Sequence, residues 1–118
     1  MMTMVLLCAL TLGLSQSQSP SPRAQDPLVM RVSAERFAFT PSEIVVAKGT
    51  TIEFHLTSDD TDHGFRIVGT DVNAEIPKRR RGETVVKYVA DTEGRFIIEC
   101  SRPCGAGHTA MRATLIVK

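Results

Sequence analysis

The sequence predicts an all-β sandwich from Leu28 to the C-terminus, and three observations support this fold class. The stretch shows no convincing helical period. Short runs of alternating apolar and polar residues recur instead, separated by glycine, proline and aspartate. The stretch holds about 90 residues, enough for a small sandwich of two packed sheets.

The alternation is clearest at residues 51–57, where we expect a strand with one apolar face and one polar face. His55 falls on the polar face and is therefore left out of the predicted site. Further strands are expected at residues 44–46, 84–89, 95–100 and 113–117, with turns at 48–49, 81–82 and 91–94. The predicted core residues are Ile52, Phe54, Leu56, Phe96, Ile98, Leu115 and Val117.

The N-terminal region predicts export. Residues 4–14 form an apolar run with the length of a signal-peptide core, too short to span a bilayer as a helix. We expect a signal peptide at residues 1–17, which includes Cys8, then a flexible proline-rich linker at 18–27 and the domain at 28–118. The mature protein would be periplasmic or otherwise extracytoplasmic, with no transmembrane span.

The charge balance argues against nucleic-acid binding. The chain has 14 basic and 13 acidic residues, a formal net charge of +1. The one local basic cluster lies at residues 78–81, and such clusters are usually solvated turns.

The most informative segment carries Cys100, Cys104, His108 and Met111 within a dozen residues. Thiolate, thioether and imidazole groups select soft metals, and methionine is not among the usual ligands of zinc. The combination therefore favours copper. His63 offers a second imidazole from another part of the fold.

Strand parity predicts where the two ends of this segment point. Cys100 has the parity of Ile98, and Met111 has the parity of Ala113, so both sulfurs are expected to face the core. Such a position would shield a bound ion from water.

The pattern Cys-x3-Cys-x3-His-x2-Met, with an upstream Asp-x-x-His followed by Phe, resembles the copper-binding CuA domain of subunit II of haem-copper cytochrome oxidases. The run His63-Gly64-Phe65 is most similar to the B-type oxidases. The likeness covers about residues 37–118 and implies a cupredoxin-like Greek-key fold with a binuclear copper centre.

The resemblance also implies a role for each ligand. Cys100 and Cys104 would bridge two copper ions, and His63 and His108 would each terminate one ion. Met111 would be the weak ligand of one copper.

The resemblance assigns the second weak ligand to the backbone carbonyl of Arg102. Family members usually carry a glutamate there, whose side chain links the site towards a second metal, and arginine cannot make that link. The chain also lacks tryptophan, through which family members often receive electrons, and no membrane hairpin is predicted. These departures leave membership of an oxidase complex open.

Two other interpretations of the cysteines stay open. An exported protein with two cysteines ordinarily pairs them in a disulfide, which would leave His108 and Met111 unexplained. A mononuclear blue-copper site could use His63, Cys104, His108 and Met111, but it would leave Cys100 spare.

Electron transfer is the function these observations favour, because a metal held by thiolates and imidazoles in a dry, rigid shell changes little on gaining an electron. The sequence also shows no nucleophile paired with a base. The resemblance implies redox partners such as a c-type cytochrome or a terminal oxidase. The protein would not be catalytic by itself but could be an electron-entry component of a cytochrome c oxidase. A periplasmic copper carrier or chaperone, or a copper-free interaction domain, are the alternatives.

Overall fold

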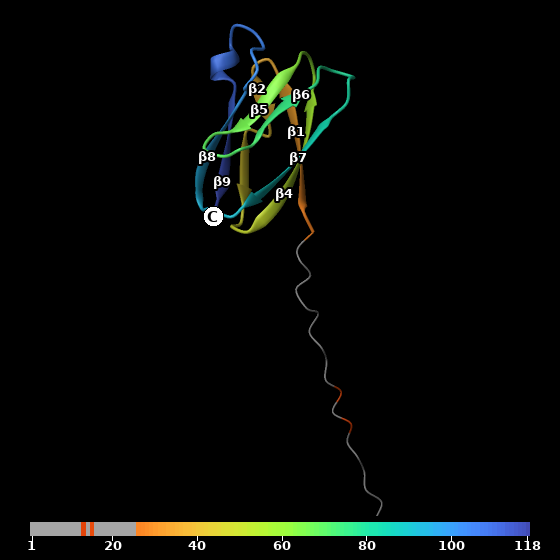
Figure 1. Cartoon of the computed structure of the whole chain (residues 1–118), viewed down its shortest axis with the longest axis vertical. Helices are drawn as coiled ribbons and strands as arrows, with labels where there is room; N and C mark the ends of the chain where they lie inside the picture. The colour runs from red at the N-terminus through yellow and green to blue at the C-terminus, as the bar shows by residue number, and fades with distance from the viewer. Residues whose placement is uncertain (1–12, 14, 16–25) are drawn as a thin grey trace, which may run out of the picture.

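A computed structural model describes residues 13, 15 and 26–118 and shows two packed β-sheets (Figure 1). The predicted signal peptide and linker fall almost entirely outside the described residues. The strands and one short 3₁₀ helix are β1 (Leu28–Glu35), β2 (Ala38–Thr40), β3 (Glu43–Val46), β4 (Thr50–Ser58), β5 (His63–Ile67), β6 (Asn73–Ile76), β7 (Thr84–Ala90), β8 (Gly94–Glu99), η1 (His108–Ala110) and β9 (Arg112–Val117).

The strand order confirms the predicted all-β sandwich. One sheet has the order β2-β1-β4-β7 and the other has the order β3-β9-β8-β5-β6. β1 pairs with β4 and β3 pairs with β9 in parallel, and the remaining pairs are antiparallel. Consecutive strands repeatedly change sheet, as β3 to β4 and β6 to β7 do, so the fold depends on contacts between distant segments.

The five predicted strands are present within one or two residues of their expected ends, as β3, β4, β7, β8 and β9. β1, β2, β5 and β6 were not predicted as strands. β5 has no alternation to detect, because His63, Gly64 and Phe65 are buried in succession. β2 contains only three residues.

The core lies between the sheets, and six of the seven predicted core residues are buried there. Phe96 is an exception, since it packs against the core but is only partly buried. The reason is that β5 pairs with β8 only at Ile98 and Glu99, so the edge of β8 beside Phe96 has no neighbouring strand.

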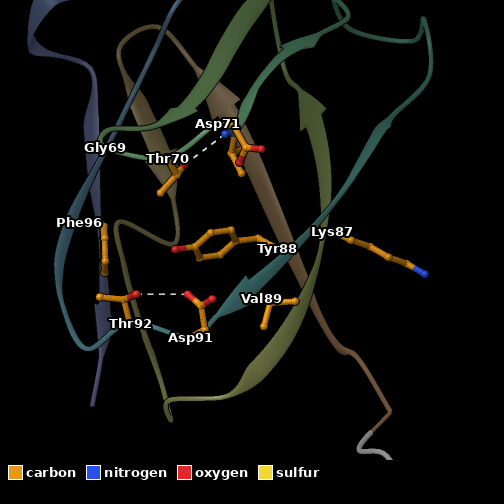
Figure 2. A pocket seen from close by; sticks show the side chains of 10 residues that line it. Gly69, Thr70, Asp71, Lys87, Tyr88, Val89, Asp91, Thr92 and Phe96 are labelled. Atoms are coloured by element: carbon orange, nitrogen blue, oxygen red, sulfur yellow. Dashed lines mark hydrogen bonds between the residues drawn. The ribbon is translucent and has the colours of Figure 1, made fainter.

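A cavity of about 460 Å³ opens at this uncovered edge. Figure 2 shows Tyr88 with its hydroxyl pointing across the cavity towards Phe96, below Thr70 and above Asp91 and Thr92, which share a hydrogen bond. None of the predicted metal ligands lines this cavity. The incomplete pairing of β8 therefore leaves a gap that is separate from the metal site.

The outer face of β4 carries His55 between two carboxylates, on the side opposite the core as its parity predicted. Its Nε2 lies 2.8 Å from Glu53 and its Nδ1 lies 3.1 Å from Glu83. The hydrogen bond with Glu53, supported by that with Glu83, outweighs the cost of burial and raises the pKa of His55 above its ordinary value of 6.5.

We predict that His55→Gln destabilises the protein more in acid than in alkali. A pKa raised by folding means that the stabilisation is complete below the unfolded-state pKa and disappears as the pH rises through the folded-state pKa. Urea unfolding at about pH 5.5 and about pH 9 measures the difference. Thr57→Gln, on the same exposed face, is the control. An equal loss at both pH values would contradict the prediction.

Candidate metal centre

Three neighbouring strands bring the predicted ligands to one end of the sandwich. His63 is the first residue of β5, Cys100 directly follows β8, and Met111 directly precedes β9. Because β8 pairs with both β5 and β9, these positions are adjacent in space. The Cys100 N–H donates to the Met111 carbonyl at 3.2 Å and closes the loop of residues 101–110.

The five predicted side chains converge, with the two sulfurs of Cys100 and Cys104 at the centre, 3.6 Å apart. The Cys100 sulfur lies 3.9 Å from Nδ1 of His63. The Cys104 sulfur lies 3.6 Å from Nδ1 of His108 and 3.8 Å from the sulfur of Met111. Each cysteine therefore has its own imidazole nitrogen.

The carbonyl of Arg102 completes this arrangement, because it accepts a hydrogen bond from the Cys100 thiol at 3.1 Å. The guanidinium points elsewhere, to Asp62 at 3.6 Å and to Glu75 at 3.1 Å. The backbone of Arg102 thus faces the site while its side chain binds the neighbouring surface.

Most of the site is shielded from water, although Cys100 and His108 line an open pocket of about 210 Å³. His63 and Met111 are fully buried, Cys100 and Cys104 are 5% exposed, and His108 is partly buried. Burial raises the pKa of the Cys104 thiol to about 11, so binding a metal at neutral pH must release protons. Both cysteines are free thiols in this structure, not a disulfide.

Asp60 orients the His63 ring. Its carboxylate lies 2.6 Å from Nε2 of His63, which leaves Nδ1 facing the Cys100 sulfur. Partial burial works against ionisation of Asp60. The hydrogen bonds it accepts, first from the Arg36 N–H and then from His63, nevertheless hold the pKa of Asp60 below its usual value.

Arg36 links the two halves of the site and was not anticipated from the sequence. Its backbone N–H donates to Asp60 at 2.8 Å, and its side-chain Nε donates to the Cys104 carbonyl at 2.8 Å. Arg36 and Cys104 are 68 residues apart, and no local pattern marks such a contact.

Gly64 is a second residue whose role the sequence did not reveal. Its N–H donates to the Cys100 sulfur at 3.4 Å. A Cβ at this position would lie 2.7 Å from the backbone nitrogens of Ser101 and Arg102. Only glycine allows the loop to pass this close to β5.

The donor set fits copper. The ligand atoms of His63, Cys100 and Cys104 all lie within 4.8 Å of one another, as ligands of a shared metal must. Two thiolates, two imidazoles and a thioether are soft or borderline donors, which copper accepts and magnesium or calcium does not.

Residues 27–117 match the family described as the periplasmic domain of cytochrome c oxidase subunit II. The chain belongs to this family. Cytochrome c oxidase subunit 2 of Thermus thermophilus is 39% identical to this family member over 88 residues, which are 74% of the chain. The match spans 63% of the Thermus protein, so the present chain corresponds to only part of the length of that protein.

Solved structures show the same fold. The periplasmic domain of subunit II of cytochrome oxidase (CoxB) of Bradyrhizobium japonicum aligns with a TM-score of 0.70 and 18% identity, over 81% of this chain and 88% of that one. Auracyanin A, a blue copper protein of Chloroflexus aurantiacus, aligns with a TM-score of 0.62 and 17% identity, over 79% and 100%. The predicted cupredoxin-like fold is thereby confirmed. No helix among the described residues is long and apolar enough to cross a membrane.

We predict that Asp60→Asn lowers copper affinity by about 10- to 100-fold, the usual effect of losing a partner that orients a ligating histidine. Competition with a chelator measures the affinity. The matched control is Asp59→Asn, an exposed neighbour whose substitution should leave copper affinity unchanged. Equal affinities for the two variants would show that the carboxylate of Asp60 does not orient His63.

Proposed function

We propose that this protein is an exported electron-transfer protein whose metal centre holds two copper ions in a CuA-type arrangement. One observation carries the proposal: each of the paired cysteine sulfurs has its own imidazole nitrogen and its own weaker donor within 4 Å. In this arrangement Cys100 and Cys104 would each hold both ions, and His63 and His108 would each hold one. Met111 and the Arg102 carbonyl would be the weaker ligands.

Bound copper would supply a centre that gains and loses one electron. The protein's own residues hold that centre still: the Asp60 carboxylate fixes the ring of His63, and Arg36 fixes the carbonyl of Cys104. Both cysteines are only 5% exposed, which limits their contact with water. A rigid, dry site changes little when its charge changes, so little reorganisation opposes electron transfer.

Copper delivery is the second candidate, and burial is the observation that separates the two functions. A carrier must release its ion to a partner and is expected to expose its ligands, whereas His63 and Met111 are fully buried here. The 3.6 Å between the two sulfurs also means that an apo protein in an oxidising compartment can form a disulfide. Loading with copper therefore requires reduced cysteines.

A c-type cytochrome or a terminal oxidase is the partner class that this function implies, on the extracytoplasmic side of the membrane. The family match supports this location, since the family is described as a periplasmic domain.

Loaded under reducing conditions, the mature protein should bind two coppers and show the spin-resonance hyperfine pattern of a mixed-valence pair. Cys100→Ser and Cys104→Ser should each abolish that pattern, because a bridging thiolate holds both ions. Met111→Leu should only shift the reduction potential, because a weak thioether tunes the site without holding it. Metal analysis and redox titration are the measurements.

His55→Ala is the spectroscopic control, because its ring lies on the outer face of β4 and should leave the copper signal unchanged. One copper per chain, with a blue spectrum that survives Cys100→Ser, would replace the binuclear centre with a mononuclear one. Absence of copper from reduced protein would contradict both.

A further inference from the structure

The loop that joins β6 to β7 carries four consecutive cations, Lys78, Arg79, Arg80 and Arg81, and all four are exposed. We call residues 78–81 the basic loop. Figure 1 shows the β6–β7 connection at the upper end of the sandwich, the end that also carries the loop between β8 and β9. The C-terminus lies at the opposite end.

The basic loop is anchored to the segment that presents His63. The residue paired with His63 across the sheet is Ile76, two positions before the loop begins. The Arg79 N–H donates to the Asp60 carbonyl at 3.0 Å, and the Lys78 N–H donates to the carboxylate of Asp62 at 2.7 Å. These bonds hold the four cations close to the metal centre.

The charge of the basic loop is not neutralised within the described chain. None of its four side chains forms an ion pair there, although Arg66, Lys87 and Arg102 do. Three carboxylates near the loop already have partners: Asp60 contacts His63, Asp62 binds the guanidinium of Arg102, and Glu83 contacts His55. Asp59 is the one exposed carboxylate of this segment without such a partner in the described chain.

The loop of residues 101–110 adds little charge of its own to this end. Its exposed positions are all uncharged: Pro103, Gly105, Ala106, Thr109 and Ala110. Arg102 is half-exposed, and its guanidinium is paired with the carboxylates of Asp62 and Glu75. The exposed positions of the ligand loop are therefore uncharged, and the four cations of the basic loop, which form no ion pair in the described chain, lie on the neighbouring connection.

We propose that the basic loop is the docking surface for a redox protein with an acidic face around its own redox group. This proposal rests on the proposed electron-transfer function and names the partner class of that site. Opposite charges steer two proteins together and fix their orientation, which raises association rates by about 10- to 1,000-fold at low salt. The sequence alone predicted only a solvated turn at residues 78–81. The proposal gives these residues a role in partner binding.

A protein partner accounts for the position of the loop better than a lipid surface does. The ligands lie at the same end of the sandwich as the basic loop. A partner bound to the basic loop therefore holds its redox group close to the metal centre. Attraction to anionic lipid would require only positive charge, at any end of the molecule.

Two variants test the proposal with the same change in net charge. The first combines Lys78→Gln, Arg79→Gln and Arg81→Gln. Arg80 is kept because its φ of 64° places it in the left-handed region of the turn. The control combines Lys48→Gln, Arg95→Gln and Lys118→Gln, three exposed cations at the opposite end, where the Lys48 N–H bonds the Lys118 carbonyl.

The measurement is the rate of electron exchange between the copper-loaded full chain and a c-type cytochrome with an acidic haem edge. At low ionic strength the basic-loop variant should react about tenfold more slowly than the unmodified protein, and the control less than about twofold more slowly. The difference should vanish in about 1 M salt, where the screening length is about 3 Å. A cytochrome with a basic haem edge should not be slowed by the basic-loop substitutions.

Equal rates for the two variants would overturn the docking surface and leave the electron-transfer function standing. Loop-dependent binding to phosphatidylglycerol vesicles, with no loop dependence towards the acidic cytochrome, would also overturn it in favour of a membrane contact. Titration of the metal-free protein with the same cytochrome measures binding alone, and so separates the proposed docking surface from the proposed electron-transfer function. Loop-dependent binding without electron exchange by the loaded protein supports the surface and contradicts the proposed function.

Discussion

The metal centre depends on one partly buried carboxylate, that of Asp60, which links the end of β1 to the ring of His63. It accepts hydrogen bonds from the backbone of Arg36 and from the ring of His63, and Arg36 in turn holds the carbonyl of Cys104. Each of these bonds involves a charged group and is stronger than a neutral one. The carboxylate is therefore what makes the ligand positions mutually dependent, so that a preformed site exists before any metal arrives.

Local patterns explain why much of the fold and the site was predictable. Alternation identified β3, β4, β7, β8 and β9 but missed the eight-residue β1, and parity placed Cys100 and Met111 towards the core, because both signals are carried by residues two positions apart. The spacing of Cys100, Cys104, His108 and Met111 is likewise a local signal. Arg36 and Gly64 escaped prediction because their roles come from contacts with a loop far along the chain. Phe96 was placed correctly by parity, but its burial depends on how far β5 extends along β8.

The two ends of the sandwich are closed to different degrees, and this asymmetry suits the proposed function. At the metal end, the 101–110 loop packs against β5 so closely that Gly64 admits no side chain. Lower down, the short pairing of β5 with β8 leaves the cavity beside Tyr88 and Phe96. The close approach at Gly64 therefore lies beside the ligands, where movement of the loop would raise the reorganisation that opposes electron transfer, and the larger cavity lies away from them.

Arg102 shows how the metal centre and the surface can vary independently within one family. A backbone carbonyl can serve as a weak ligand whatever side chain the residue carries, so arginine in place of the usual glutamate leaves that donor in position. The side chain instead binds Asp62 and Glu75, so one positive charge offsets part of the negative charge of these two carboxylates. The charge at this end of the sandwich thus depends on Arg102 as well as on the four cations of the basic loop. Substitutions that never touch the metal can in this way change which redox partner the same centre serves.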